Sequence, residues 1–318
     1  MPKVSVIVPV YGVENYIERC ARSLFEQTLD DIEYLFIDDC TPDRSIEMLN
    51  RVLDEYPQRK NQVIIHRMEK NSGQAAVRKW GMLNATGDYV IHCDSDDWVD
   101  VTMYEKMYNK AIEEGCDVVV CDYVVTDGEK VLDSVKGCGD TDVSKFIQRL
   151  LFQRDTWSLW NKLFKRIVCY KDLIYPEGNM GEDMTLCIQS MLQCKRMSYV
   201  SELYYNYFFN ENSITNKRDV NRLICNFEQL KGNTDILIIL LENTALLNKK
   251  WAINSLQYNA KTNLLNLIHR DKKYYNLWMN TYKGSNMVFI INPFVKVDKR
   301  LKCLMAILKL YPQKKDRI

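Results

Sequence analysis

The residues best suited to chemistry are acids that follow a short apolar run. Asp94-Ser95-Asp96 comes directly after Tyr89–Cys93, which has the composition of a buried strand. Two carboxylates spaced i, i+2 repel each other unless positive charge lies near them, and a hard divalent cation with oxygen ligands meets that need. The alternative is an exposed acidic turn that caps the next helix. The position after a buried strand favours the cation site.

Two other polar groups follow earlier strands of the chain. Pro9-Val10-Tyr11 closes the first apolar run, and Asp38-Asp39 closes the second. Ligands of open α/β sheets bind beyond the carboxyl ends of the strands. There the Tyr11 ring can stack on a base or sugar, and the two acids are placed like the carboxylate that holds ribose hydroxyls in dinucleotide folds. Neither GxGxxG nor GxxxxGK[ST] occurs, which weighs against a dehydrogenase or a P-loop enzyme.

Arg78 and the pair Glu182-Asp183 each have two interpretations. Arg78 lies on a helix expected between the third and fourth strands, where it is either surface decoration or a partner for a carboxylate or phosphate. Glu182 and Asp183 follow a glycine and open an apolar helix, which is a favourable place for acids near a helix N-terminus. A carboxylate there can also act as a general base. Composition leaves both questions open.

Strands and helices alternate from the start of the chain to Tyr123. The expected strands are Val4–Val10, Tyr34–Ile37, Val63–Ile65, Tyr89–Cys93 and Val118–Cys121. The expected helices are Glu14–Gln27, Arg44–Tyr56, Gly73–Ala85 and Met103–Glu114. Strands that are almost continuously apolar predict an α/β fold with a Rossmann-like, mostly parallel sheet flanked by helices on both faces.

The alternation stops after Tyr123. Trp157–Phe164 is aromatic and mixed, and Ser198–Phe209 is a tyrosine-rich strand. The other expected elements are helices: Lys145–Phe152, Glu182–Leu192, Asn233–Leu247, Trp251–Ile268 and Leu301–Tyr311. The sequence therefore predicts a helical C-terminal part.

Charge is divided unequally along the chain. The 318 residues carry 43 Lys/Arg and 42 Asp/Glu, for a net charge of +1. Residues 245–318 hold 15 Lys/Arg and 3 Asp/Glu, a net charge of +12, so residues 1–244 hold 28 and 39, a net charge of −11. A basic tail on an acidic body suggests an anionic partner surface, and a solvated helical face is the alternative.

Cysteine usage and the start of the chain indicate a compartment. The 11 cysteines are an odd number without a CxxC pair, which favours free thiols in a reducing cytoplasm. The first apolar run is too short for a signal peptide, and no stretch approaches the ~18 apolar residues of a spanning helix. We expect a cytoplasmic protein.

Taken together, these segments resemble the family 2 glycosyltransferases of bacterial polysaccharide biosynthesis, which are inverting enzymes with the GT-A nucleotide-diphospho-sugar transferase fold. The resemblance covers about residues 3–215 and is carried by these segments in order: Val4–Tyr11, Asp38-Asp39, Asn71-Ser72-Gly73 with Arg78, Thr86–Tyr89, Asp94–Asp97 and Glu182-Asp183. It implies a GT-A domain at residues 1–215, with a nucleotide-sugar-binding half (1–125) and an acceptor-binding half (126–215). Residues 216–318 would form the helical C-terminal extension.

The resemblance also implies a role for each site residue. The nucleotide-sugar-binding residues would be Pro9, Val10, Tyr11, Glu14, Asp39, Gly73, Arg78, Asp94 and Ser95. Among them, Asp39 would hold the base and Asp94 would face the ribose. Asp96 would bind Mn²⁺ or Mg²⁺ against the pyrophosphate, and Asp183 would be the catalytic base with Glu182 beside it.

The chain departs from the family pattern at three places. Cys40-Thr41-Pro42 follows the two acids where the family more often has Gly-Ser-Thr, and Lys79 follows Arg78 where an asparagine is common. His92 replaces a bulky apolar residue, and a satisfied strand histidine is favoured over a metal ligand. Of Trp157 and Trp160, one is expected in the core and the other in the acceptor wall, without a choice between them.

The C-terminal segment Leu301–Tyr311 has its own alternatives. It reads as a basic amphipathic helix, bracketed by Lys299, Arg300, Lys314 and Lys315. Such a helix can lie in a membrane interface or pack on the main domain. A membrane surface and a homo-oligomer are therefore candidate partners. A nucleic-acid role is weak, since arginine is sparse.

Together with the residues that carry it, the resemblance implies a metal-dependent, inverting glycosyltransferase. It would transfer a sugar from a nucleotide-diphosphate donor, a UDP-sugar, to a hydroxyl of a glycan or lipid-linked glycan. It would be cytoplasmic, with the inner face of the cell membrane as a candidate location. The alternatives are a catalytically inactive nucleotide-sugar-binding protein on the same fold and a nucleotidyltransferase.

Overall fold

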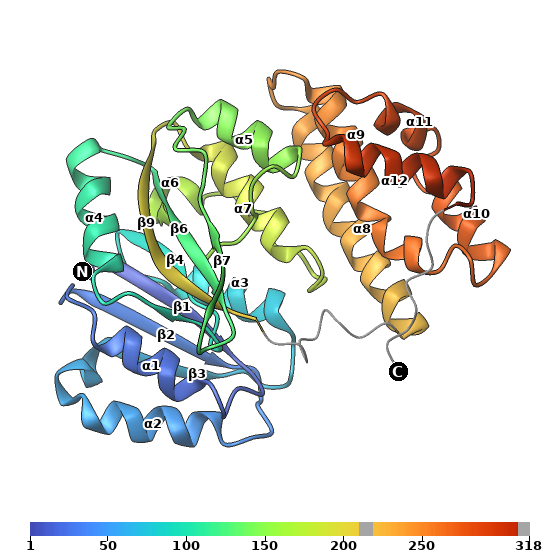
Figure 1. Cartoon of the computed structure of the whole chain (residues 1–318). Helices are drawn as coiled ribbons and strands as arrows, with labels where there is room; N and C mark the ends of the chain where they lie inside the picture. Colours follow the sequence, from blue (N-terminus) through green and yellow to red (C-terminus); the bar gives the residue numbers. More distant parts are fainter. Residues whose placement is uncertain (210–218, 311–318) are drawn as a thin grey trace. The chain divides into compact units, whose positions relative to one another are not determined.

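The first four strands pair in parallel and bring their carboxyl ends to one edge of a sheet. In the computed structural model, which describes residues 1–209 and 219–310, they are β1 (Val4–Val10), β2 (Ile32–Asp38), β3 (Val63–Arg67) and β4 (Tyr89–His92). Their order is β3-β2-β1-β4 (Figure 1). Val4 pairs with both Ile32 and Tyr89, so β1, β2 and β4 begin at the same level. The predicted α/β fold is confirmed.

Beyond β4 the sheet becomes mixed. It continues through β8 (Lys162–Lys165), β6 (Val118–Thr126), β9 (Met197–Phe208) and β5 (Trp98–Val99), with β7 (Val131–Val135) beside β6. β6 and β9 run parallel, whereas β8 runs antiparallel to both β4 and β6. The sequence predicts a mostly parallel sheet and misses the antiparallel β8. This strand is only four residues long and begins in the aromatic Trp157–Phe164 segment, which shows no strand period.

The two faces of β1 show how the sheet is covered. Val4, Val6, Val8 and Val10 point into one core cluster with residues of α1 (Ile17–Phe25) and α2 (Ser45–Glu55), which Figure 1 shows beside the strands. Ile7 points to the opposite face, where α3 (Gln74–Asn84) packs. A Cβ on Gly81 of α3 would lie 2.5 Å from Ile7 Cγ2, so the close approach of α3 to β1 requires this glycine. Because successive side chains of the strand alternate in direction, β1 packs against helices on both faces of the sheet.

Helix boundaries follow local turn chemistry. α4 (Met103–Glu114) has the predicted bounds, because Gly115 adopts a left-handed φ of +61° and ends the helix. α1 begins three residues later than predicted, since Tyr16 N donates to Val13 O in a preceding turn. The remaining short elements of the N-terminal and middle segments are η1 (Pro57–Gln62), α5 (Val143–Leu151) and α6 (Arg166–Cys169).

The chain forms two compact units. The first contains the sheet and comprises Met1–Phe146, Trp157–Tyr175 and Gln189–Glu211. The second comprises Ile147–Thr156, Pro176–Ile188 and Asn212–Ile318. The start of α7 (Glu182–Gln193) thus belongs with the C-terminal helices. The domain boundary predicted at residue 215 lies outside the described residues and stays a prediction.

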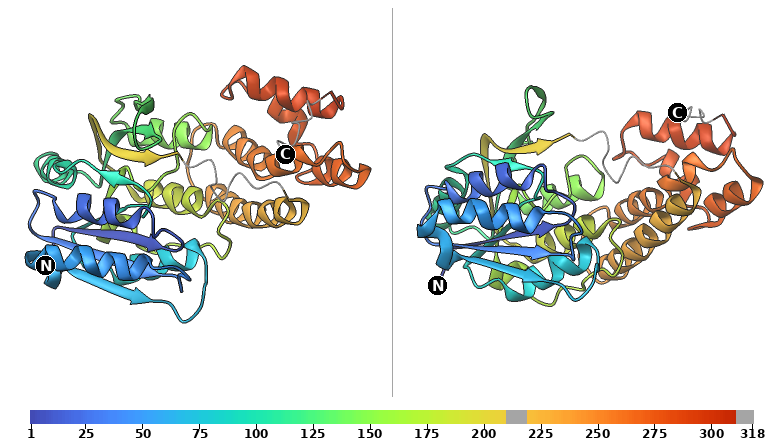
Figure 2. Two further views of the ribbon diagram at one scale, coloured as in Figure 1. Left: turned by 60° about the horizontal axis from the view of Figure 1, so that its bottom comes forward. Right: turned by 90° about the horizontal axis from the view of Figure 1, so that it is seen from below.

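The second unit is helical, as predicted, but its helix boundaries differ. Its longer helices are α8 (Val220–Glu242), α9 (Lys249–Ala260), α10 (Lys272–Asn280) and α12 (Val297–Ile307), with η3 (Thr262–Asn266) and α11 (Ser285–Ile290) between them. α8 and α9 pack side by side (Figure 2). α8 begins far before the predicted Asn233, because the Asp219 side chain caps it by accepting from Arg222 N. The predicted Trp251–Ile268 helix ends at Ala260 and gives way to η3. The predicted end of the last helix, Tyr311, and Lys314 and Lys315 lie outside the described residues.

A buried lysine ties the C-terminal helices together. Lys261 is fully buried, and its Nζ donates to Thr281 O and to Ser285 Oγ, both at 2.8 Å. Burial lowers the pKa of this amine to about 8. In residues 1–209 and 219–310, no helix combines the length and apolar composition that crossing a bilayer requires.

Candidate active site

The loop after β1 is bound to the loop after β2. Gly12 N donates to Thr41 Oγ1 at 2.9 Å, and Val13 N donates to Ser45 Oγ at 3.0 Å. The Glu14 side chain accepts from Arg44 N at 3.0 Å, so this exposed acid joins the two loops. Cys40-Thr41-Pro42, where the chain departs from the family, therefore supplies one of these contacts.

Pro9, Val10 and Tyr11 differ in what they offer at the edge of the sheet. The Val10 side chain is buried in the core cluster, so only its backbone reaches the edge, and its carbonyl accepts from Asp39 N at 3.0 Å. Pro9 is partly buried within the strand. Tyr11 lies just beyond the strand with 46% of its surface exposed. Of the three, Tyr11 has the side chain available for stacking on a ligand.

Asp39 holds the loop that opens α3. Its two carboxylate oxygens accept from Ser72 N at 2.7 Å and Gly73 N at 2.8 Å, and the side chain is 4% exposed. Gly73 has a left-handed φ of +82°, which suits glycine. Asp38 accepts from Thr41 N and pairs with Arg67. Both acids thus shape the edge of the sheet, in addition to any contact they make with a ligand.

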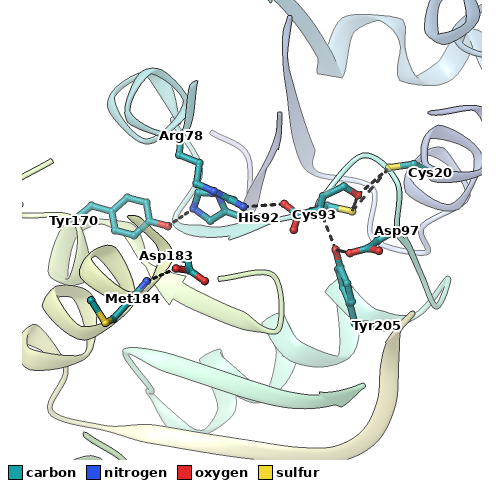
Figure 3. Close-up of polar contacts among 10 residues, drawn as sticks. Cys20, Arg78, His92, Cys93, Asp97, Tyr170, Asp183, Met184 and Tyr205 are labelled. Carbon is teal, nitrogen blue, oxygen red and sulfur yellow. Dashed lines mark hydrogen bonds and ion pairs between the residues drawn. The ribbon is translucent and has the colours of Figure 1, made fainter. Parts of the chain in front are cut away.

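Arg78 is a buried cation directed at the acidic cluster (Figure 3). It is 3% exposed, and its Nη2 lies 2.8 Å from Asp94 Oδ1. Its Nη1 lies 3.0 Å from His92 Nδ1, and His92 Nε2 lies 3.2 Å from Tyr170 Oη. The structure therefore supports the paired arginine of the two sequence interpretations. Tyr170, His92, Arg78 and Asp94 form a continuous polar chain across the sheet edge.

The proton positions in this chain follow from Arg78. A guanidinium group only donates, so His92 Nδ1 must accept and the ring proton lies on Nε2, which donates to Tyr170 Oη. Burial, together with the charge of Arg78, lowers the pKa of His92 well below its ordinary value. The imidazole is therefore neutral. These contacts confirm the prediction of a satisfied strand histidine.

Asp96 and Asp97 have different surroundings. Burial, followed by the charge of Asp94, raises the pKa of Asp96 to about 6. Asp97 is almost fully buried and accepts from Tyr205 Oη at 2.6 Å and from Phe208 N at 2.7 Å. Asp97 thus fastens β9 to the acidic turn. Ser95, between Asp94 and Asp96, is 6% exposed.

Arg19 is a site residue that the sequence reasoning missed. Its Nη2 donates to Asp96 O at 3.0 Å, and its guanidinium carbon lies 3.6 Å from the centre of the Trp98 ring and 4.8 Å from that of Phe208. It is one of several charged residues on α1, and nothing in its local sequence separates it from them. The pairing of β5 with β9 brings both rings to it.

Asp94 and Asp96 suit a divalent cation. Two carboxylates stand at one strand end, and each of them is partly exposed. Within the described residues, no three His, Cys, Asp or Glu side chains gather as a metal site. Mg²⁺ and similar cations at phosphate sites commonly take one or two protein carboxylates, with phosphate oxygens and water as the other ligands.

In the second unit, α8 fixes the loop that leads to Asp183. Asn233 Nδ2 donates to the carbonyls of Gly178 and Met180, both at 2.9 Å. Gly181 has a φ of +82°, and a Cβ there would lie 2.5 Å from Leu230 Cδ1. Asp183 then enters α7 and accepts from Met184 N at 2.7 Å (Figure 3). Glu182 beside it is buried.

The two tryptophans of the middle segment have separate places. Trp160 is buried and stacks on Tyr205, with ring centres 4.2 Å apart. Trp157 is half-buried. Trp160 is therefore the core residue of the pair, and Trp157 is left as the candidate for an acceptor wall.

Comparison with known proteins agrees with this fold. The crystal structure of S. aureus TarS 1–349 in complex with UDP-GlcNAc matches 97% of this chain and 88% of that chain, with a TM-score of 0.71 and 21% identity. The mannosyltransferase PcManGT from Pyrobaculum calidifontis, in complex with GDP-Man and Mn²⁺, matches 99% and 88%, with a TM-score of 0.54 and 16% identity. Both likenesses show a GT-A-like mixed α/β fold with C-terminal helices.

Sequence comparison identifies the family. Residues 5–173 match the model of glycosyl transferase family 2, so the chain belongs to that family. The uncharacterized glycosyltransferase EpsJ of Bacillus subtilis is 29% identical over 224 residues, which are 68% of this chain and 63% of EpsJ. The match thus spans less than two thirds of this curated relative. The family resemblance predicted from the sequence is confirmed.

Proposed function

We propose that the chain is an inverting glycosyltransferase that moves a sugar from a nucleotide-diphosphate donor, a UDP-sugar, to a hydroxyl of a glycan or lipid-linked glycan. The observation that carries this proposal is the ion pair between buried Arg78 and partly exposed Asp94, beside Asp96 at the carboxyl edge of a family 2 fold. Ligands of such sheets bind at this edge. TarS, which has the same fold, binds UDP-GlcNAc.

The donor would lie along the edge formed by β1, β2 and β4. Tyr11 would stack on the base, while Val10, Pro9 and Asp39 form the wall behind it. Glu14 supports this wall through Arg44 N, and Gly73, with its left-handed φ, donates its N–H to Asp39. Asp94, held by Arg78, and Ser95 would face the ribose.

Asp96 would hold Mn²⁺ or Mg²⁺ against the pyrophosphate. When bound, such a cation stabilises the negative charge that grows on the leaving nucleotide diphosphate. PcManGT, of the same fold, is described in complex with Mn²⁺. The two carboxylates of the Asp94-Ser95-Asp96 turn supply oxygen donors suited to this ion.

Asp183 would act as general base. A carboxylate oxygen takes the proton of the acceptor hydroxyl as that oxygen attacks the anomeric carbon, and a positioned base contributes about 10²–10⁴-fold to such a step. Attack opposite the leaving group inverts the anomeric centre without a covalent intermediate. Glu182 would support the base, and Asn233 of α8 binds the loop that leads to it through the carbonyls of Gly178 and Met180.

Two other functions compete with this proposal. An inactive nucleotide-sugar-binding protein would need no base, so the presence of Asp183 together with Asp94 and Asp96 weighs against it. A nucleotidyltransferase would want a basic, glycine-rich loop after the first strand, and Tyr11-Gly12-Val13-Glu14 contains no basic residue.

Release of UDP tests the proposal. A panel of UDP-sugars is incubated with the wild type and with Asp96→Ala, each with Mn²⁺ or with EDTA. We expect Mn²⁺-dependent release from one donor, lost in the variant. Metal-dependent UDP binding without release from any donor would support the inactive binding protein. If the protein neither releases UDP from any donor nor binds UDP, a UDP-sugar donor is contradicted.

A further inference from the structure

An exposed apolar stripe runs along α12. Val297, Leu301, Leu304 and Leu308 follow one another at intervals of four, three and four residues, which places them on one helix face. All four are exposed, Val297 to 63% and Leu308 to 56%. Met305 lies exposed beside them. Soluble proteins rarely leave such a continuous stripe uncovered.

The opposite face of α12 already has its packing partner. Cys303 and Ala306 are fully buried, and Cys303 Sγ donates to Asn286 O of α11. Of the two sequence alternatives, a membrane interface and packing on the protein, this face of α12 takes the second and leaves the other face free. α12 packs through its small residues and presents the large apolar ones to solvent.

The surroundings of the stripe are basic. Lys296, Lys302 and Lys309 are exposed on or next to α12. The acid on the helix, Asp298, is 3.7 Å from Lys302 and is balanced by it. Residues 245–318 as a whole carry 15 Lys/Arg and 3 Asp/Glu.

We propose that the α12 stripe docks on an anionic lipid surface. Apolar side chains enter the boundary between headgroups and acyl chains while flanking lysines meet anionic headgroups, which is how amphipathic helices bind membranes. A second copy of this chain fits less well, because a two-fold contact would set one lysine-flanked stripe against another. The inference is independent of the transferase reaction.

Vesicle flotation of the full chain tests this docking. The variant Leu301→Gln/Leu308→Gln changes the stripe, and Ile239→Gln changes an equally exposed apolar residue of α8 as a matched control. We expect the wild type and the control to float with phosphatidylcholine–phosphatidylglycerol vesicles and not with phosphatidylcholine alone. The stripe variant should lose about tenfold or more of the bound fraction.

Three outcomes would overturn the docking proposal. They are no flotation of the wild type, flotation that ignores the anionic lipid, and equal flotation of the stripe variant. Sedimentation velocity tests whether a second copy of the chain covers the stripe instead. A wild-type dimer that the stripe variant abolishes would assign the stripe to that contact.

A second inference rests on the polar chain Tyr170–His92–Arg78–Asp94. The Arg78 guanidinium is planar, so two contacts are enough to fix its orientation. His92 Nδ1 accepts from Arg78 Nη1 at 3.0 Å, and Arg78 Nη2 lies 2.8 Å from Asp94 Oδ1. Tyr170, from α6's end, holds the far side of the imidazole ring.

We infer that His92 and Tyr170 are positioning residues for the donor site, acting through Arg78. This inference rests on the proposed function. His92 is fully buried and lies against Arg78, so its own side chain is not exposed at the edge. Its contribution is to keep Arg78 aligned, and with it the carboxylate of Asp94.

The two nitrogen atoms of His92 allow a sharp test. Asparagine at 92 places an acceptor near the position of Nδ1, whereas leucine removes it, so His92→Asn and His92→Leu form a matched pair. In calorimetric titration with UDP and Mn²⁺, we expect His92→Leu to weaken binding about tenfold and His92→Asn to keep affinity within about threefold. Tyr170→Phe should fall between them.

The outcomes separate this inference from the proposed function. Wild-type protein that binds no UDP contradicts the proposed function. Wild-type binding with equal affinities for His92→Leu and His92→Asn overturns the positioning role. Affinity losses that follow the melting temperatures of the variants, rather than the presence of the acceptor, would assign His92 to stability alone.

Discussion

Asp96 and Asp97 are adjacent carboxylates that the fold uses in different ways. Asp97 is buried between Tyr205 Oη and Phe208 N and accepts from both. Burial, followed by the charges of Asp96 and Asp94, raises its pKa well above the ordinary value. Asp96 is the more exposed of the two and lies next to Asp94. Asp97 therefore holds β9 in place, and Asp96 is placed to bind a ligand.

Substitution should separate these two roles. Asp97→Ala leaves the buried Tyr205 Oη and the partly buried Phe208 N without this acceptor, and we expect it to lower the free energy of unfolding by about 1–3 kcal/mol. Asp96→Ala should change it by less than about 0.5 kcal/mol. Urea denaturation followed by circular dichroism measures both. Equal losses for the two variants would contradict the assignment of Asp97 to the structure and Asp96 to the ligand.

At the scale of residues, the sequence could predict those that combine a distinctive type with a strand end. Asp94, Asp96 and Tyr11 follow this rule and lie at the expected edge. Arg78 was ambiguous because pairing with His92 and Asp94 depends on how α3 packs. Arg19 could not be found, because the rings that cover it come from β5 and β9, about 80 and 190 residues further on.

At the scale of elements, α8 packs on the loop at residues 178–181 and holds it by hydrogen bonds. Gly181 combines a left-handed φ with a position where an added Cβ would lie 2.5 Å from Leu230 Cδ1, so the Leu230 side chain would have to shift. Asn233 and Gln229 of α8 bond to the same loop. The position of Asp183 at the start of α7 therefore depends on a helix some 50 residues later in the chain.

Gly181→Ala tests this contact between α8 and the loop, with a second glycine substitution as a control. We expect Gly181→Ala to cost about 1–3 kcal/mol of unfolding free energy, since both the φ and the Leu230 contact oppose a Cβ. Gly232→Ala, within α8 and with nothing within 4 Å of the added Cβ, should stabilise by about 0.5–1 kcal/mol. Thermal denaturation of both variants decides it. A stabilised Gly181→Ala would mean that the loop is not clasped as described.

Element prediction succeeded where the hydrophobic period was long and the ends were marked. α4 was predicted at both ends because Gly115 stops it, and β1 because seven apolar-rich residues precede Tyr11. β8 was missed, since four residues cannot display a period. The start of α8 was misplaced because Asp219 caps it by a local side-chain bond that the apolar pattern does not reveal.

At the scale of the whole molecule, stability should vary with pH through Lys261. The folded protein releases the Lys261 proton near pH 8, and the unfolded chain near the ordinary 10.5. Between these values the unfolded chain holds more protons, so unfolding free energy rises with pH, by on the order of 3 kcal/mol over the window. Lys261→Met removes this group and should flatten the rise.

Urea denaturation at pH 7.5 and at about pH 10 measures the effect as the difference between the wild type and Lys261→Met, so that other titrating groups cancel. We expect the wild type to gain stability relative to the variant as pH increases. If the difference in unfolding free energy between the wild type and Lys261→Met stays constant or falls as pH increases, Lys261 titrates normally in the folded state.

The division of charge is the other feature of the whole molecule that the sequence revealed. The acidic body contains the sheet and the proposed donor site, and the basic residues gather toward α12. Which face of α12 is exposed could not be predicted, because the apolar period alone does not say whether the large or the small residues are packed. Cys303 and Ala306 decide this in the structure.

The most direct test of the central claim is the configuration of the sugar that leaves the donor. Proton NMR follows cleavage of the active UDP-α-sugar with Mn²⁺, for the wild type and for Asp183→Asn. We predict that the β-anomer appears first, and that Asp183→Asn slows the reaction by about 10²–10⁴-fold. First appearance of the α-anomer, or full activity of Asp183→Asn, would contradict an inverting transferase with Asp183 as its base.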